Sequence, residues 1–308
     1  MLHARAFKVS VVWTLALLFL GSVVHATESS LACPDWPTCF GTMVPEMTGG
    51  VFWEHLHRLV AGGLVLMFGL ATWLAKQETG TRPRIFRASL AGMGLLVVQS
   101  VFGGLTVIYR LPDMVSTTHL TLAFGFLALA TVLAAATSRP DSALTPRAPA
   151  VGRSLRLYAG VAAGLVFGQS VVGALVRHTD GGMSCPDLPL CLGQVVPPLV
   201  NIQIISHFTH RVLAVVTTAA VLGVVWWAYR SDVPGRLRRW LVAAAALVVL
   251  QVGLGVASVL TILAVVPVST HTLVAAMLLS VLVYVSTVAG ESLERRPEAG
   301  RDLEAAGV

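Results

Sequence analysis

The chain contains Cys33-Pro34-Asp35-Trp36-Pro37-Thr38-Cys39-Phe40-Gly41, and 152 residues later it contains Cys185-Pro186-Asp187-Leu188-Pro189-Leu190-Cys191-Leu192-Gly193. The two cysteines, the Cys-Pro-Asp start, the second proline and the final glycine recur in the same order. Three more features recur at an offset of 152 or 153 residues: His57-Arg58 as His210-Arg211, Gln99 as Gln251, and His119 as His271. Four features in one register predict a tandem duplication, and a repeat of this kind determines the architecture.

Each repeat contains apolar segments long enough to cross a lipid bilayer. Of the 308 residues, 56% are hydrophobic and 12% are charged, and the mean hydropathy is +0.79. A spanning helix needs about 20 apolar residues. We predict eight, at Phe7–His25, Val51–Ala75, Ala88–Ile108, Thr117–Thr137, Leu157–Val176, Ile205–Tyr229, Trp240–Ile262 and Thr270–Ala289. The expected fold is an all-α polytopic membrane protein with two four-helix bundles, which excludes a water-soluble enzyme.

The basic residues indicate how these helices cross the membrane. Of the 21 Lys and Arg residues, 17 lie at residues 5–8, 76–87, 139–156, 230–239 and 295–301, which are all on one side. The opposite connections hold only Arg110 and Arg177, with Arg58 and Arg211 just inside helices. By the positive-inside rule both termini are cytoplasmic. The net charge of +6 therefore indicates topology, and nucleic-acid binding is not expected.

The duplication also sets the expected boundaries. We predict an amino-terminal half at 1–137, a cytoplasmic linker at 138–156, a carboxy-terminal half at 157–289 and a polar cytoplasmic tail at 290–308. The first 26 residues also fit a secretory signal cleaved after Val24-His25-Ala26. Because this segment has the counterpart Leu157–Val176 inside the chain, we keep it as the first helix. The expected location is the cell (inner) membrane, with the cysteine loops outside.

The four cysteines form two Cys-x5-Cys pairs, Cys33 with Cys39 and Cys185 with Cys191, each in an outer loop. An oxidising compartment favours disulfides, and five intervening residues can close a small ring. Redox-active thiols are a second interpretation. A metal site of four thiolates is a third, although the pairs lie on different repeats and lack zinc-knuckle spacing.

The strongest chemical signal comes from four histidines at equivalent positions. His57, His119, His210 and His271 each lie near the start of an even-numbered predicted helix, in the outer half of the membrane. Ionisable groups within a membrane are costly and mark candidate functional sites. Each half holds one pair on neighbouring even-numbered helices, and two imidazoles facing across a bundle can bind the iron of a flat macrocycle. We therefore predict two bis-histidine haem sites.

Two other kinds of site would use the same histidines. Zinc or copper would need three or four ligands converging on one point, whereas each repeat supplies two. A proton relay would need ionisable groups across the whole membrane, and the cytoplasmic halves of these helices hold none.

Taken together, these features resemble the haem A synthase family over about residues 5–290. The matching elements are the duplicated four-helix layout, Glu54-His55-Leu56-His57-Arg58, His207-Phe208-Thr209-His210-Arg211, the lone His119 and His271, and the paired cysteines. The resemblance implies an oxidoreductase that converts the C8 methyl group of haem O to the formyl group of haem A for terminal oxidases. It implies that the amino-terminal half binds the substrate haem on His57 and His119, and that the other half holds haem b on His210 and His271. It also implies association with haem O synthase.

Glu54 is the main difference between the two halves. It lies three residues before His57 on the same helical face, and the second half has His207 at that position. A carboxylate in a first helical turn is also favoured by the helix dipole alone. The resemblance implies that Glu54 is needed for catalysis, as a proton acceptor beside the haem edge.

Two histidine ligands leave the iron no open position for dioxygen. We therefore favour a mechanism in which electrons are removed and water, deprotonated by Glu54, attacks the methyl carbon. Release of one histidine during turnover is the other route. The second haem would pass electrons to an acceptor that the sequence does not identify; a quinone is one candidate.

The remaining polar groups allow more than one interpretation. Arg58 and Arg211 could contact haem propionates or anchor their helices at the membrane interface. Gln99, Gln169 and Gln251, each near a glycine, are expected to serve helix packing. A two-haem cytochrome b, a membrane thiol oxidoreductase and a haem carrier are the alternative functions. Glu54 in one half only favours the synthase over the cytochrome, and Cys-x5-Cys is unlike a Cys-x-x-Cys redox pair.

Overall fold

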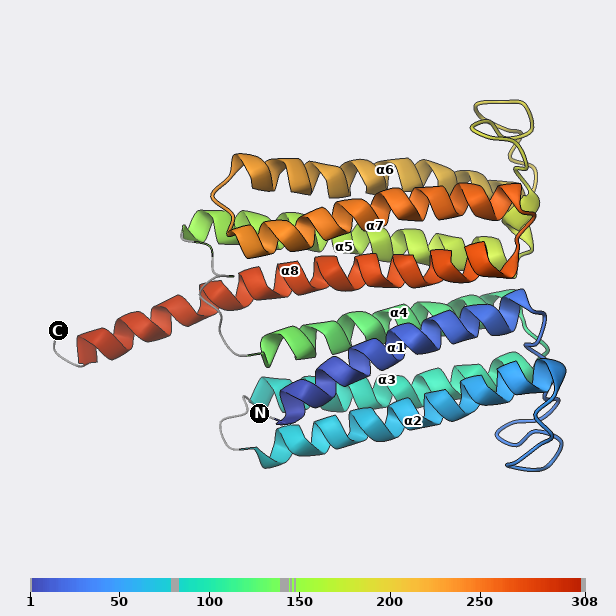
Figure 1. Ribbon diagram of the computed structural model, residues 1–308, viewed down its shortest axis with the longest axis horizontal. Helices are drawn as coiled ribbons and strands as arrows, with labels where there is room; N and C mark the ends of the chain where they lie inside the picture. The colour runs from blue at the N-terminus through green and yellow to red at the C-terminus, as the bar shows by residue number, and fades with distance from the viewer. Residues whose placement is uncertain (1, 79–82, 139–143, 145, 147, 306–308) are drawn as a thin grey trace.

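The computed structural model contains helices and no strands among the residues it describes, which are 2–78, 83–138, 144, 146 and 148–305, with backbone alone for 291–305 (Figure 1). In chain order the elements are α1 (Leu2–Ala26), α2 (Gly49–Gln77), α3 (Pro83–Ile108), α4 (Asp113–Ala136), α5 (Pro149–His178), the short 3-10 helix η2 (Gly181–Met183), α6 (Ile202–Arg230), α7 (Gly235–Leu260) and α8 (Val265–Ala305). Eight of them are long and apolar enough to cross a membrane. The predicted all-α fold with eight spans is confirmed.

The helices extend beyond the apolar segments from which they were predicted. The helix α5 begins at Pro149, inside the predicted linker, and α8 continues to Ala305, beyond the predicted start of the tail. Proline is favoured in the first helical turn because its missing N–H group needs no partner there. Arg177 was expected in an outer connection but lies in the last turn of α5. A cation at a helix C-terminus is stabilised by the helix dipole, which favours this continuation.

The helices form two groups of four, α1–α4 and α5–α8, lying side by side (Figure 1). Contacts between the groups join α1 to α8, and α4 to both α5 and α8. These four central helices bury 33–50% of their spans inside the protein, compared with 17–28% for the peripheral helices α2, α3, α6 and α7. The contact between the halves is therefore made by the first and last helix of each half.

One apolar core crosses the boundary between the halves. It joins Leu18 of α1 and Leu127 of α4 to Leu155 of α5 and Leu279 of α8, all buried. Small residues such as Ala162 lie in the same cluster. In lipid, small side chains allow helices to approach closely, and dispersion contacts replace the hydrophobic effect as the main attraction. The two halves thus pack as one body.

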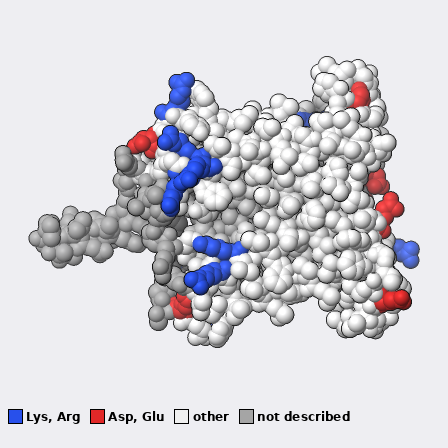
Figure 2. All heavy atoms as spheres, viewed as in Figure 1, with Lys and Arg blue, Asp and Glu red and all other residues white. Residues whose placement is uncertain are grey.

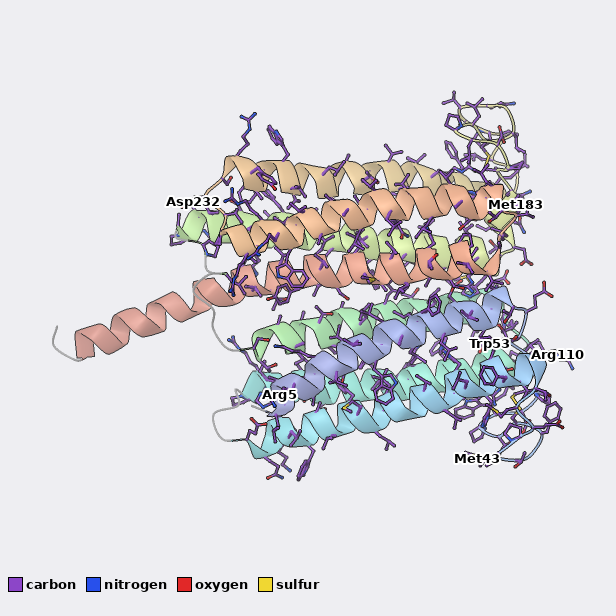
Figure 3. The ribbon with its side chains drawn as sticks, viewed as in Figure 1. Arg5, Met43, Trp53, Arg110, Met183 and Asp232 are labelled. Atoms are coloured by element: carbon purple, nitrogen blue, oxygen red, sulfur yellow. A yellow bond between two sulfur atoms is a disulfide. The ribbon has the colours of Figure 1, made fainter. Side chains whose placement is uncertain are left out.

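Charged side chains collect at the two ends of the helices, and the surface between the ends shows almost no Lys, Arg, Asp or Glu (Figure 2). Arg5 and Asp232 lie at the end where the chain begins, and Met43, Trp53, Arg110 and Met183 lie at the other (Figure 3). Most of the visible Lys and Arg side chains lie at the first end, as the charge pattern predicts. The side of the membrane that each end faces stays a prediction. Arg82, Arg139 and Arg147 lie outside the described residues, as do the side chains of Arg295, Arg296 and Arg301.

Candidate functional site

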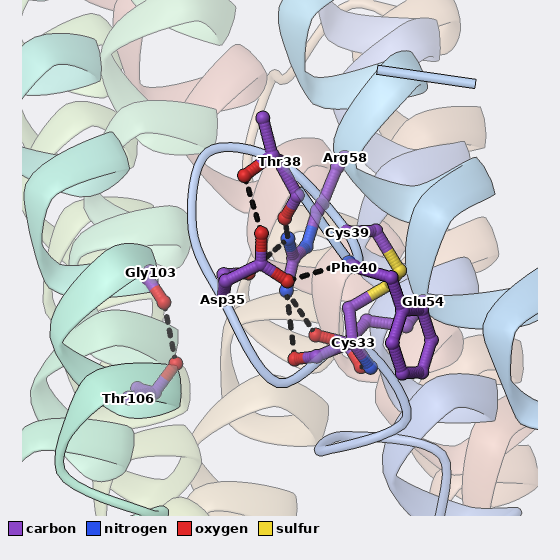
Figure 4. A network of polar contacts seen from close by, with 9 residues as sticks. All are labelled: Cys33, Asp35, Thr38, Cys39, Phe40, Glu54, Arg58, Gly103 and Thr106. Carbon is purple, nitrogen blue, oxygen red and sulfur yellow. Dashed lines mark hydrogen bonds and ion pairs between the residues drawn. A yellow bond between two sulfur atoms is a disulfide. The ribbon is translucent and has the colours of Figure 1, made fainter. Parts of the chain in front are cut away.

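The two cysteine loops have the same internal structure. Each contains a disulfide, Cys33–Cys39 and Cys185–Cys191, with Cα–Cα distances of 4.8 and 4.6 Å. In the first loop the Asp35 carboxylate accepts hydrogen bonds from the Thr38 hydroxyl and the Phe40 amide (2.6 Å) (Figure 4). It also accepts one from the Gly41 amide (2.9 Å). Hydrogen bonds from Thr38 and Gly41 hold the pKa of Asp35 below its usual value. The loop is therefore organised around one carboxylate.

The second loop repeats this arrangement at Asp187, which accepts from the amides of Leu192 and Gly193, both at 2.7 Å. The final glycine of each loop has a positive φ, +72° for Gly41 and +73° for Gly193. This left-handed conformation is open to glycine without a steric penalty, which explains its place in both copies.

Arg58 of α2 and Arg211 of α6 attach the two cysteine loops to these helices. Arg58 Nη1 donates to the carbonyls of Asp35 (2.8 Å) and Thr38 (2.6 Å). Arg211 Nη1 donates to the carbonyls of Asp187 (2.8 Å) and Leu190 (2.7 Å), and its Nη2 donates to that of Cys185. The structure thus gives both guanidinium groups an anchoring contact. Their contact with haem propionates stays a prediction.

Glu54 connects the first loop to the α2 helix. It is buried at 4% exposure; its Oε1 lies 2.5 Å from Arg58 Nη2, and its Oε2 accepts from the Cys33 amide at 2.8 Å. In the second half His207 is also buried, but its Nδ1 lies 2.8 Å from the carbonyl of Gly181. A carboxylate is therefore present at this position in the first half only, and each of its two oxygens already has a hydrogen-bond partner.

The four candidate iron ligands lie at matched depths. His57 and His210 are each eight residues past the start of their helix, α2 and α6, while His119 and His271 are each six past the start of α4 and α8. The ring centroids of His210 and His271 are 6.4 Å apart. An iron ion about 2 Å from a nitrogen on each ring would separate two facing imidazoles by roughly this distance. His57 and His119 occupy the equivalent positions in the first half.

Backbone carbonyls orient two of these rings. His119 Nδ1 lies 3.1 Å from the carbonyl of Gln99, and His271 Nδ1 lies 3.1 Å from that of Gln251. When Nδ1 donates to a carbonyl, the proton is fixed there and Nε2 keeps the lone pair that binds a metal. The side-chain amides also approach the imidazoles, with Nε2–Nε2 distances of 3.4 Å for Gln99 to His119 and 3.1 Å for Gln251 to His271.

Gln169 contacts the imidazole of His210, with its Nε2 3.1 Å from the His210 Nδ1. The first-half counterpart of Gln169 is Leu17. The three glutamines therefore do more than the helix packing expected from the sequence: each contacts a candidate iron ligand. Gln99 and Gln251 each lie 20 residues before the histidine they contact, and this shared spacing was the available signal; Gln169 lies 41 residues before His210 and has no such counterpart.

Each of the four imidazoles lies against a glycine of a neighbouring odd-numbered helix. A Cβ atom at the glycine would lie 2.9–3.2 Å from the histidine Cε1, which is closer than an ordinary contact. The pairs are His57 with Gly21, His119 with Gly103, His210 with Gly173 and His271 with Gly255. The same close contact in all four places holds the rings in defined positions. Together with the donor set, it fits one bis-histidine haem per half.

His55 forms a second cluster beside the first disulfide. A ring nitrogen of His55 and the sulfurs of Cys33 and Cys39 lie within 4.8 Å of one another, and all three residues are buried. The disulfide joins both sulfurs, and the described residues contain no free cysteine. In this state the group offers a metal ion only the imidazole, so it does not form a metal centre.

A family comparison matches the region that contains the four histidines and Glu54. The cytochrome oxidase assembly protein family, COX15-CtaA, matches residues 46–283. The chain belongs to this family. Its relatives include the haem A synthase of Symbiobacterium thermophilum, 31% identical over 82% of this chain and 84% of the relative. The haem A synthase of Rhodospirillum centenum is 30% identical, over 84% and 82%, and that of Shouchella clausii is 28% identical, over 92% and 96%. The predicted membership of the haem A synthase family is confirmed.

Proposed function

We propose that this protein is a haem A synthase that oxidises the C8 methyl group of haem O to a formyl group. The observation that carries the proposal is the pair of matched imidazole sites together with a buried carboxylate, Glu54, which lies three residues before His57 and has no buried carboxylate as its counterpart among the described residues of the second half. The names of the relatives support haem A formation as the activity. We assign the substrate haem to His57 and His119 in the amino-terminal half.

The oxidation needs water and an electron acceptor. Two successive two-electron steps convert the methyl group and two waters to a hydrated aldehyde, four electrons and four protons, and loss of one water leaves the formyl group. Glu54 is the carboxylate nearest His57 in sequence, and general-base catalysis by such a group contributes about 10²–10⁴-fold. Arg58 holds the carboxylate at 2.5 Å and so fixes its position.

Water as the oxygen source can be tested separately. Turnover in ¹⁸O-labelled water should place the label in the alcohol formed by the first oxidation, whose oxygen does not exchange with solvent. Label derived only from ¹⁸O₂ at that stage would reject water attack and favour release of one histidine during turnover.

His210 and His271 would hold haem b, which supplies a one-electron redox centre when bound. We propose that the electrons leave the protein to a membrane acceptor of the quinone class. We also propose that haem O arrives from haem O synthase by direct association. The protein's own contribution is to orient the two imidazoles through Gly173, Gly255 and the carbonyl of Gln251.

The deciding experiment expresses the protein with a haem O supply and separates the extracted pigments by chromatography. Wild-type protein should yield haem A, whereas Glu54→Gln should yield at most about a hundredth as much. Glu28→Gln is the control, because Glu28 is an exposed carboxylate beyond α1. Haem b without any haem A from the wild-type protein would instead indicate an electron-transfer cytochrome, and haem O recovered unchanged would indicate a carrier.

A further inference from the structure

The two halves meet at a polar contact between the helices α1, α5 and α8, at the end of the molecule where the cysteine loops lie. Ser22 of α1 is buried, and its Oγ lies 3.2 Å from Thr272 Oγ1 of α8. Arg177 of α5 donates from Nη1 to Ser22 Oγ at 3.0 Å and from Nη2 to the Ser22 carbonyl at 2.8 Å. We call Ser22, Arg177 and Thr272 the inter-half junction.

Every member of the junction is adjacent to one of the histidine sites. Ser22 follows Gly21, which contacts the His57 ring. Thr272 follows His271. Arg177 is one helical turn past Gly173, which contacts the His210 ring, a rise of about 6 Å along the helix. The Arg177 guanidinium therefore joins the part of α1 that contacts the His57 ring to the part of α5 that contacts the His210 ring.

This guanidinium carries a charge that no carboxylate balances among the described residues. Its hydrogen bonds go to the hydroxyl and carbonyl of Ser22, and its Nε is buried without a partner. The His25 and His178 rings pack at 5.4 Å at the same end, and neither supplies a negative charge. Arginine remains protonated in proteins, and an unbalanced charge acts more strongly in a low-dielectric interior than in water.

The charge is also present in only one half. Arg177 lies 152 residues after His25, so His25 is its counterpart in the duplication. The two copies therefore differ in fixed charge at this position, as they differ in the carboxylate of Glu54.

We propose that Arg177 is a positioning residue whose fixed charge raises the reduction potential of the haem b held by His210 and His271. The proposal rests on the haem b assignment made above. Reduction lowers the positive charge at the iron by one, so a nearby cation stabilises the reduced form. Each electron released by the substrate in the first half then moves more favourably to the second half, before it leaves to the quinone-class acceptor.

The test is a redox titration of the haem b absorption band in purified, full-length protein. Arg177→Met should shift the midpoint potential to a more negative value, whereas Arg177→Lys, which keeps the charge, should stay close to wild type. Arg153→Met is the matched control, because it removes the same charge from an exposed position at the other end of α5. Its midpoint potential should not change.

A second pair of variants leaves Arg177 in place. Ser22→Asp puts a carboxylate where the hydroxyl now accepts from Arg177, so it should neutralise the charge and also shift the potential to a more negative value. Ser22→Asn, of the same shape without the charge, should not. The proposal is wrong if Arg177→Met and Ser22→Asp both keep the midpoint potential of Arg153→Met. Wild-type protein that binds no haem b would instead reject the proposed function.

Discussion

At the scale of single residues, the site depends on glycines as much as on histidines. The imidazoles of all four candidate ligands touch a glycine on the neighbouring helix, where a side chain would be too close. A ring held in this way has little freedom to turn, so its metal-binding nitrogen is already oriented before a ligand arrives. Pre-orientation of this kind reduces the entropy that binding must overcome.

Gly173→Ala tests this contact. The added Cβ would lie 2.9 Å from His210 Cε1, so the ring or the helix must move. Overpacking of this kind costs about 1–3 kcal/mol, which corresponds to a loss of haem b affinity of about 5- to 160-fold. The measurement is a spectroscopic titration of haem-free protein with haem b. Gly168→Ala on the same helix, where nothing lies within 4 Å, should bind as wild type; equal affinity in the two variants would show that the contact does not orient His210.

The sequence predicted the histidines and Glu54 because their spacing recurs and the chemistry of each residue type is specific. It did not predict Gly21, because glycine in an apolar helix serves close packing as often as ligand placement. Arg177 was assigned to a connection because an arginine after an apolar segment usually ends the span. Its burial depends on Ser22, which is 155 residues away in sequence and becomes a neighbour only through packing.

At the scale of elements, the cysteine loops are short polar structures built on one carboxylate each. Asp35 accepts hydrogen bonds from the amides of Phe40 and Gly41, and Arg58 donates one to the carbonyl of Asp35. The repeated Cys-Pro-Asp start and final glycine predicted that the two loops would match. The arginine contact could not be predicted, since Arg58 is separated from the loop by the whole start of α2.

Asp35→Asn should weaken the first loop, because one acceptor oxygen and the negative charge are lost. Hydrogen exchange at Phe40 and Gly41 should become faster, while Glu46→Gln, an exposed carboxylate in the same connection, should leave it unchanged. The pKa of Asp35 is lowered in the folded state. Its stabilising contribution is therefore complete above the usual pKa, 3.8, and is lost as the pH falls through the lower folded value. Unchanged exchange in Asp35→Asn would contradict this role.

At the scale of the whole molecule, the duplication places two pairs of histidines in similar surroundings, and we propose a different role for each pair. The first and last helix of each half form the shared centre, and each site lies between the centre and the peripheral helices. Hydropathy and the repeat together predicted eight spans in two groups. They did not predict which helices would be central, because all eight are apolar enough to face lipid.

Labelling with a membrane-impermeant maleimide tests the orientation. The four native cysteines are disulfide-bonded, so an introduced thiol is the only free one among the described residues. Val195→Cys, in the exposed second cysteine loop, should react in intact cells. Asp232→Cys, in the exposed connection between α6 and α7 at the other end, should react only after permeabilisation. The opposite pattern would overturn the predicted cytoplasmic termini.

The most direct test of the central claim compares His119→Ala with His271→Ala for both haem b content and haem A formation. Because we assign the substrate haem and haem b to separate halves, His119→Ala should keep haem b at the wild-type ratio to protein and form no haem A. His271→Ala should lose haem b. Equal loss of haem b in both variants, or normal haem A formation in His119→Ala, would contradict two matched sites with divided roles.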